Sequence, residues 1–436
     1  MCLAWAIFVV YGSLVPLEFQ ALPAGAAWQR LVNAPMFNID VHGRADWIAN
    51  GVLYLPLGFL VTAVGLGDRR PGTARTLWAV LLALLSSAAL AVTVEYAQAY
   101  FPPRTVSLND LVAECIGSVF GALLAVAGTR RLQVLTDGFR AGGALLQRRL
   151  APAYAVAYGA LALFPYDLLL NGDEWRERLQ GGNTGLLLAA APLQSGTALV
   201  LARLSAELLA AMPLGLWWAA RRTGAGQNGR GQNLPWRGAL LRGALLGLVI
   251  EIAQLCIASG VSQGASVLSR SIGFTVGAVA WNGRAAWPVE SWRALLRRVT
   301  LPALAIYLPT LTVLYGWWRQ PWLAWDAALA RLHTELHYLP FYYHYFSTEM
   351  NAVSSLVSVA LSYAPVGLLA WSWHVGARTA GAFAMLLALG LEGCRLLSSV
   401  GHPDPTNLLI AGVSAWATQR LLVSLAAPPP RIANRT

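Results

Sequence analysis

The chain has 436 residues, of which 57% are hydrophobic and 12% charged, and its mean hydropathy is +0.53. A soluble domain could not bury so much apolar surface, so the composition indicates an integral membrane protein. All 31 basic residues are arginines and the net charge is +11. Because these arginines gather in short segments between apolar runs, they indicate a membrane face and no nucleic-acid partner.

Apolar runs long enough to form helices recur along the whole chain. A helix that crosses a bilayer needs about 20 predominantly apolar residues. The first run lacks the basic segment of a signal peptide and is expected to remain as a helix. The predicted fold class is therefore all-α, a polytopic membrane protein with about twelve transmembrane helices. The predicted helices lie near residues 2–17, 46–66, 77–98, 108–128, 152–170, 196–220, 239–258, 266–283, 300–318, 352–373, 379–399 and 405–425.

The sequence repeats itself three times. A Pro-x-Gly pair occurs in the second helix of each third, and a glutamate lies near the outer end of each following helix. Fifteen residues after these glutamates come Asp110, Ser266 and Asn407. Such a period predicts a repeat architecture. We expect three tandem four-helix repeats over residues 1–130, 150–284 and 299–425. The Arg- and Gly-rich stretches 129–150, 221–242 and 284–299 are expected to be cytoplasmic connectors between helices. The repeated residues are Pro56, Gly58, Pro213, Gly215, Pro365, Gly367, Glu95, Glu251 and Glu392.

Seven polar side chains of the first repeat are predicted to converge near the outer leaflet. Residues three or four apart share one face of a helix, and a loop of about nine residues holds two of these faces together. These candidate ligand-binding residues are Asp46, Asn50, Glu95, Gln98, Arg104, Asp110 and Glu114. Weaker candidates in the second and third repeats are Glu207, Glu251, Gln254 and Glu392.

Two interpretations of this cluster stay open. Arg104 could neutralise Glu95 or Asp110 in a structural ion-pair cluster that closes the helix bundle. Alternatively, the cluster forms a head-group pocket open to the outside. The pocket interpretation is favoured because the acids outnumber the nearby arginine, and because ionisable residues inside a membrane are costly and commonly functional.

Smaller features point to packing. Gly117 and Gly121, like Gly273 and Gly277, form small-xxx-small pairs that let helix backbones approach closely. Pro56 and Pro213 are expected to kink their helices. The four cysteines lie in or beside apolar runs without CxxC spacing, which indicates neither a disulfide framework nor a zinc site. These cysteines are Cys2, Cys115, Cys256 and Cys394.

The histidines predict no metal site. His333 and His337 in HTELH are four residues apart, but the order is not HExxH and no third ligand is evident. The aromatic segment 337–346 is expected to lie at the outer interface as an aromatic belt or a re-entrant segment. We expect neither a metal nor a cofactor.

The first repeat resembles the VanZ-like family, which is named for an accessory protein of glycopeptide-resistance clusters. The resemblance rests on an Asn with a Pro-x-Gly two turns later, then Glu-x-x-Gln, a loop arginine, an aspartate and a small-residue helix. It departs at Glu114, where such proteins often have asparagine. The matching residues are Asp46, Asn50, Pro56, Gly58, Glu95, Gln98, Arg104, Asp110, Gly117 and Gly121.

The resemblance implies a bacterial inner-membrane protein of the cell envelope. Tripled chains with a segment like LPFYYHYFSTEMN are similar to members linked to exopolysaccharide and exosortase systems. The preferred function is a non-catalytic one, in which the protein binds or helps to handle a lipid-linked glycan or peptidoglycan precursor. Its expected partners are membrane lipids and either a lipid-linked glycan or envelope biosynthesis proteins.

Two alternatives stay open. One is an intramembrane hydrolase or transferase in which Glu95 or Asp110 acts as base and Arg104 clamps a phosphate or carboxylate. The other is a transporter, which fits the helix count. The three tandem units of equal orientation are unlike the inverted halves of many transporters.

We predict that both termini lie in the cytoplasm. Connectors after even-numbered runs hold 18 arginines, whereas those after odd-numbered runs hold 7, and the arginine-rich loops face the cytoplasm. Residues 99–107 then lie outside. An alkaline phosphatase fused to the C-terminus should be inactive and a cytoplasmic reporter active; the reverse pattern would reject this topology.

Overall fold

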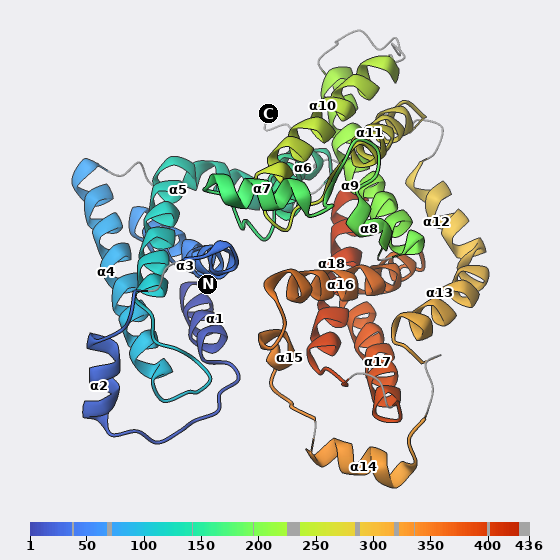
Figure 1. Ribbon diagram of the computed structural model, residues 1–436. Coiled ribbons are helices and arrows are strands. Elements are labelled where there is room, and N and C mark those ends of the chain that lie inside the picture. Colours follow the sequence, from blue (N-terminus) through green and yellow to red (C-terminus); the bar gives the residue numbers. More distant parts are fainter. Residues whose placement is uncertain are drawn as a thin grey trace, which may run out of the picture. The chain divides into compact units, whose positions relative to one another are not determined.

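The structure is a computed structural model that is 78% helical, so the all-α prediction is confirmed. It describes residues 1–36, 39–67, 72–141, 143–194, 196–224, 236–283, 288–317, 322–334, 336–398 and 402–426. The chain folds into two compact units (Figure 1). Unit 1 comprises Met1–Asp137 and Arg148–Arg284, and unit 2 comprises Gly138–Gln147 and Ala285–Thr436.

Unit 1 contains one short pair of strands and two successive groups of helices. The first helix group runs from α1 to α5 and the second from α6 to α11. The strands β1 (Thr184–Gly185) and β2 (Ser262–Gln263) are parallel, with Thr184 opposite Ser262. The helices are α1 (Cys2–Leu14), α2 (Ala24–Val32), α3 (Val41–Leu66), α4 (Thr73–Gln98), α5 (Leu108–Ala141), α6 (Gly143–Ala162), α7 (Gly172–Gln180), α8 (Ala190–Gln194), α9 (Thr197–Gly224), α10 (Trp236–Leu255) and α11 (Gly264–Gly283).

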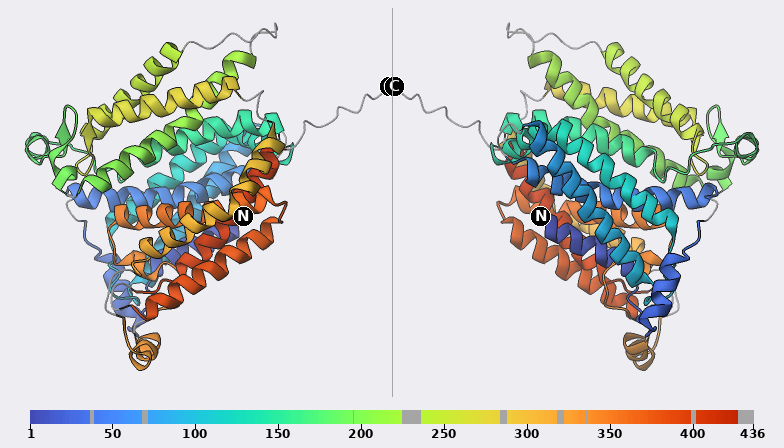
Figure 2. Two further views of the ribbon diagram at one scale, coloured as in Figure 1. Left: turned by 90° about the vertical axis from the view of Figure 1, so that its right-hand side faces the viewer. Right: turned by 90° about the vertical axis from the view of Figure 1, so that its left-hand side faces the viewer.

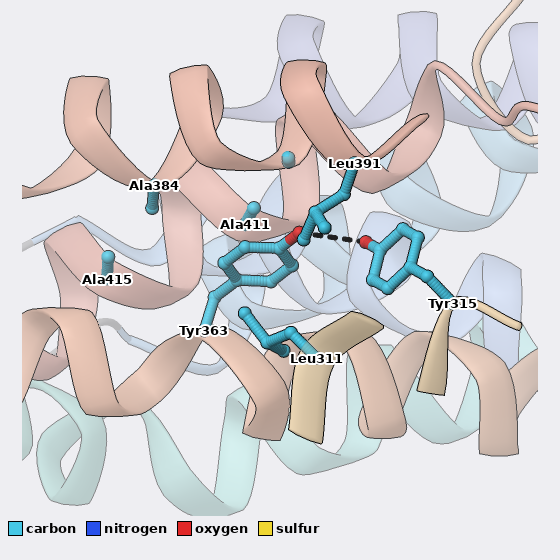
Figure 3. Packing of buried hydrophobic residues seen from close by; sticks show 8 residues of the cluster. Leu311, Tyr315, Tyr363, Ala384, Leu391, Ala411 and Ala415 are labelled. Carbon is cyan, nitrogen blue, oxygen red and sulfur yellow. Dashed lines mark hydrogen bonds between the residues drawn. The ribbon is translucent and has the colours of Figure 1, made fainter. Parts of the chain in front are cut away.

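Unit 2 is built around three long helices that pack on one another, α16, α17 and α18 (Figure 1). A core of buried residues lies between these helices and α13. There the hydroxyl groups of Tyr315 and Tyr363 are 2.8 Å apart, beneath Leu391 (Figure 3). The helices are α12 (Val289–Arg298), α13 (Thr300–Leu314), α14 (Trp325–Thr334), α15 (Tyr342–Tyr345), α16 (Glu349–Ser372), α17 (Ala377–Leu396) and α18 (Thr406–Ala426).

Eight helices in the described part of the chain are long and apolar enough to cross a membrane. They are α3, α4, α5, α9, α10, α16, α17 and α18, and the pair α12 and α13, bent by 65°, would make a ninth span. Shorter apolar helices occur at Cys2–Leu14 and Leu150–Ala162. A helix lies over every predicted range, but the prediction of twelve spans is not confirmed by helix length and composition.

The predicted connectors have more structure than expected. Residues 129–150 are helical on both sides of residue 142, since α5 continues to Ala141 and α6 begins at Gly143. Helix α12 occupies most of the third connector. Residues 225–235 and 284–287, from the second and third connectors, lie outside the described residues.

Glycines bring α3 and α5 into direct backbone contact. A Cβ added at Gly117 would lie 1.9 Å from the carbonyl oxygen of Gly51, and one at Gly121 would lie 2.0 Å from that of Leu55. The same packing joins α9 and α11, where Gly273 faces Leu208 at 2.0 Å. Helices α9, α10 and α11 run side by side (Figure 2). The predicted packing role of these small residues is therefore observed.

We predict that Gly121→Ala destabilises unit 1. The new methyl group would overlap the backbone of α3, so the two helices must separate, and overpacking of this kind costs about 1 to 3 kcal/mol. The matched control is Gly128→Ala on the same helix, because a Cβ there meets nothing within 4 Å. Thermal unfolding of the purified protein measures both. Equal unfolding temperatures for the two variants would contradict the close packing.

Candidate functional site

A buried carboxylate links the end of α4 to the start of α5. The Glu95 side chain is 1% exposed, and its Oε2 accepts a hydrogen bond of 3.0 Å from the backbone N–H of Ser107. Ser107 directly precedes α5. The N–H groups at the beginning of a helix have no partner within the helix, and a negative charge is favourable there. Glu95 therefore supplies the missing acceptor from the neighbouring helix.

The predicted acids of the first repeat lie near one another. Asn50 on α3 donates a hydrogen bond of 2.8 Å to Oδ1 of Asp110 on α5. Asp46 is electrostatically coupled to Asp110, and Glu114 is coupled to both Asp110 and Glu95. Glu114 is buried, Asn50 and Asp110 are partly buried, and Asp46 is exposed. These residues adjoin a buried group, the floor of the acid cluster, which consists of Glu95, Glu114 and Tyr54.

Arg104 and Gln98 face the end of α1. Arg104 donates from Nε to the carbonyl oxygen of Val15 and from Nη2 to that of Gly12, both at 2.7 Å. Gln98 donates to the carbonyl oxygen of Ser13 at 3.2 Å. Arg104 is also coupled to Glu95 and Asp110. Its position therefore ties the loop between α4 and α5 to the last carbonyl groups of α1.

Three buried polar atoms at the floor lack a hydrogen-bond partner among the described residues. They are Oε1 of Glu95, Oε2 of Glu114 and the hydroxyl of Tyr54. Tyr54 is fully buried beside Glu114, and the two side chains interact electrostatically, although the Tyr54 hydroxyl makes no hydrogen bond of normal distance and angle. Unsatisfied buried polar groups are uncommon and call for an explanation.

The second helix group of unit 1 contains a closed ion network. Glu251 on α10 accepts a hydrogen bond through Oε2 from the backbone N–H of Gln263, twelve residues later, and through Oε1 from Arg270. Arg270 also lies 3.2 Å from Oε1 of Glu207, which pairs with Arg203 at 3.3 Å. Arg270 is 3% exposed. Two arginines thus balance two glutamates, although Oε2 of Glu207 has no hydrogen-bond partner among the described residues.

Unit 2 repeats the glutamate contact with different partners. Glu392 on α17 accepts a hydrogen bond of 3.0 Å through Oε2 from the backbone N–H of Asp404, again twelve residues later. Its Oε1 accepts from the side-chain amide of Asn407. Arg395 lies 3.4 Å from the same carboxylate and stacks over the ring of Tyr315. Both oxygens of Glu392 are therefore satisfied.

Sequence reasoning did not single out Arg270 or Tyr54. Arg270 is the charged residue inside the predicted helix 266–283, and it follows Glu251 at the spacing by which Glu114 follows Glu95. Tyr54 precedes Pro56 by two residues, as Tyr363 precedes Pro365. These spacings were available in the sequence, but their meaning depends on which partners each side chain meets.

The histidine pair does not share a helix. Helix α14 ends at Thr334, so His337 lies beyond it, stacked on Tyr342 with ring centroids 3.8 Å apart. His333 and His337 therefore do not lie on successive turns of one helix. Among the described residues, no three histidine, cysteine, aspartate or glutamate side chains are placed to hold a metal ion.

A second polar contact in unit 1 joins α3 to α7. Arg44 binds the carboxylate of Glu174 through two hydrogen bonds of 2.9 and 3.0 Å. Glu174 also forms a capping box with Asn171 at the start of α7. A cavity of about 370 Å³ beside this pair is lined by residues of both segments, among them Asp40, Glu177 and Arg178. The residues of the acid cluster do not line this cavity.

A comparison with known protein families finds a match in the first part of the chain. Residues 1–129 match the VanZ/LLP1 family model. The predicted resemblance is confirmed over that range, which contains the acid cluster, whereas the match does not extend over residues 130–436. No curated protein and no solved structure matches the chain. A VanZ-like domain together with apolar helices fits a membrane protein of the VanZ-like type.

We predict that the contribution of Glu174 to stability disappears in acid. Its hydrogen bonds from Arg44 and from the backbone N–H of Leu170 lower the pKa of Glu174 from 4.5 to about 2. A lowered folded-state pKa stabilises the fold above pH 4.5, and this effect is lost as the pH falls toward 2. Glu174→Gln should lower the unfolding temperature at pH 7.

The deficit of the Glu174→Gln variant should shrink as the pH approaches about 2. Asp173→Asn on the same helix is the control, because Asp173 is 90% exposed and its ion pair with Arg176 is at the surface. Thermal unfolding in detergent across this pH range measures both variants. A deficit that stays constant with pH would contradict the ion-pair origin.

Proposed function

We propose that the protein is a non-catalytic membrane protein that binds, or helps to handle, a lipid-linked glycan or peptidoglycan precursor of the bacterial envelope. The proposed binding site is the acid cluster within residues 1–129. One observation carries the proposal: Oε1 of Glu95 has no hydrogen-bond partner among the described residues, whereas Oε1 of Glu251 accepts from Arg270 and Oε1 of Glu392 accepts from Asn407.

Energetic reasoning supports a binding role for the cluster. Burying an ionisable group at the centre of a membrane helix costs about 2.5 to 3.5 kcal/mol on insertion scales, and such groups usually persist because they are paired or functional. Glu251 and Glu392 are paired by Arg270 and Arg395. Glu95 and Glu114 each retain an unsatisfied oxygen, which favours a partner that comes from outside the chain.

We further propose that the chain consists of three tandem repeats over residues 1–130, 150–284 and 299–425. Support comes from equal spacings: each glutamate accepts from the backbone N–H twelve residues later. The Pro-x-Gly glycines provide further support. A Cβ on Gly58, Gly215 or Gly367 would meet a carbonyl oxygen on the next-but-one helix, that of Ser118, Phe274 or Ala415. Each of these residues lies 23 positions after the glutamate of its repeat.

The second and third repeats then act as scaffold, and the first carries the function. This assignment fits the family match, which covers the first repeat. The arginine distribution supports an inner-membrane location with both termini in the cytoplasm, so that the acid cluster opens outward. The resemblance to the VanZ-like family supports a role in the envelope, in either glycopeptide resistance or exopolysaccharide production.

The position of Arg104 favours binding over catalysis. In the enzyme alternative, this guanidinium clamps a phosphate or carboxylate next to a carboxylate base. Two of its nitrogens instead donate to the carbonyl oxygens of Val15 and Gly12. Arg104 therefore positions the loop that carries Ser107, whose backbone N–H binds Glu95. We expect its replacement by alanine to lower protein abundance, with a cost of about 3 to 5 kcal/mol if buried acids lose their partner.

We expect Glu95→Gln and Asp110→Asn to leave folding intact and to remove lipid binding. Both changes keep the shape of the side chain and its ability to accept a hydrogen bond, but they remove the charge that a ligand would recognise. Membrane abundance is measured together with the lipids that co-purify, identified by mass spectrometry. The expected result is normal abundance and loss of a polyprenyl-linked species present in the unaltered protein.

Glu392→Gln is the matched control, because Glu392 makes the corresponding backbone contact in unit 2. It should leave the co-purified lipids unchanged. Retention of the same lipids by Glu95→Gln and Asp110→Asn at normal abundance would refute the pocket. Loss of abundance in both would assign the cluster to helix packing.

A further inference from the structure

The three buried glutamates use one oxygen in the same way and the other in different ways. In each case Oε2 accepts the backbone N–H that precedes the next helix, which fixes the orientation of the carboxylate. Oε1 of each glutamate is then left to interact with another group. The hydrogen-bond partner of Oε1 therefore indicates which kind of chemical group each site accommodates.

In the second helix group, the partner of Oε1 is the guanidinium of Arg270. Nη1 of Arg270 donates to Oε1 of Glu251, and Nη2 lies 3.2 Å from Glu207. Its Nε also donates to the hydroxyl of Tyr158 at 3.1 Å. Arg270 therefore fills the interior with a cation that donates hydrogen bonds to two carboxylates and a tyrosine.

In the first helix group, the residue at the corresponding spacing is an acid. Glu114 follows Glu95 by nineteen positions, as Arg270 follows Glu251. Oε1 of Glu95, Oε2 of Glu114 and the hydroxyl of Tyr54 have no hydrogen-bond partner among the described residues. All three residues are at most 2% exposed. These buried groups thus offer two carboxylate oxygens and one hydroxyl, without a cationic donor such as the one that Arg270 supplies in the second helix group.

We infer that the floor of the acid cluster takes a primary ammonium group of a lipid or lipid-linked ligand, in the role that the Arg270 guanidinium has in the second helix group. This inference rests on the proposed function and names the part of the ligand that the site recognises. An ammonium group carries three N–H donors and no acceptor, which matches the two carboxylate oxygens and the hydroxyl of Tyr54. The exposed Asp46 and the partly buried Asp110 add negative charge beside these buried groups, which attracts a cation.

Other ligand groups fit the floor less well. A phosphate would face the like charges of Glu95, Glu114 and Asp110, and its oxygens accept hydrogen bonds as the floor atoms do. A metal ion needs several convergent ligands, and the described residues hold no such group. The ammonium could belong to an aminophospholipid or to an amino sugar on a polyprenyl carrier.

The first test compares ligands with and without the ammonium group. Purified full-length protein in nanodiscs is offered phosphatidylethanolamine or its N-acetyl form, and separately a polyprenyl-phosphate amino sugar or its N-acetyl form. Acetylation leaves each molecule otherwise intact but removes the charge. We expect it to weaken binding of the preferred ligand by about tenfold or more, because hydrogen bonds to charged groups are the strong ones.

The second test fills the site from within. Glu114→Arg introduces at this position the residue type found at 270, so the new guanidinium should pair with Glu95. The variant should unfold at the same temperature as the unaltered protein or higher, and should no longer bind the ammonium ligand. Asp173→Arg makes the same charge change at a 90% exposed position of unit 1 and should leave binding unchanged.

The outcomes separate the inference from the function on which it rests. Equal binding of the amine and N-acetyl forms, or binding retained by a folded Glu114→Arg, would overturn the ammonium site. If the amine and N-acetyl forms of the polyprenyl ligand both bind, the ammonium site is overturned but the proposed function is retained. Selective binding of phosphatidylethanolamine alone would support the ammonium site and contradict the glycan ligand. Absence of binding to every probe would overturn both the ammonium site and the proposed function. The acetylation comparison uses the unaltered chain, so it tests the ammonium site even if the Glu114→Arg variant fails to fold.

Discussion

A buried carboxylate joins two successive helices at three places in this protein. Backbone N–H groups at the start of a helix lack acceptors within the helix, and because the donor residues here are buried, another part of the chain must supply the acceptor. Glu95, Glu251 and Glu392 each supply one such acceptor from the end of the preceding helix. Because donor and acceptor are only twelve residues apart, the contact fixes how the two helices meet. The glycine contacts then bring a third helix against this hairpin with its backbone touching.

The same contact explains why the three glutamates can have different roles. Once Oε2 accepts the backbone hydrogen bond, Oε1 still needs a hydrogen-bond donor. The side chain nearest to Oε1 determines which donor it meets. Arg270 and Asn407 satisfy this oxygen for Glu251 and Glu392. Tyr363, at the position that corresponds to Tyr54, is likewise satisfied by Tyr315 (Figure 3). In the first helix group, Oε1 of Glu95 has no hydrogen-bond partner among the described residues, so the same backbone contact occurs with different surroundings.

Arg104 lies near the acids, as expected, but it also binds the end of α1. A lone arginine among carboxylates indicates either an ion pair or an anion clamp. Its guanidinium donates to the carbonyl oxygens of Val15 and Gly12 at the end of α1, where a helix leaves carbonyl groups without intrahelical partners, and it also interacts electrostatically with Glu95 and Asp110. It therefore anchors the loop from which the backbone N–H of Ser107 reaches Glu95. Removal of the arginine would disturb the cluster through the backbone as well as through charge.

The sequence by itself determined the membrane environment, the all-α class, the helix positions and the set of acids in the first helix group, because composition and helical period are local properties. It also identified the small residues at which helices touch. Only the tertiary structure decided which acids are neutralised, since Arg270 meets Glu251 across two helices and Tyr54 lies beside Glu114 without a hydrogen bond of normal distance and angle. The ion pair of Arg44 with Glu174, 130 residues apart, was likewise beyond local patterns. Spacing along a helix fixes which face a side chain occupies, but the partner on the opposing helix depends on how the chain folds back, and that partner sets the charge and hydrogen bonding of the site.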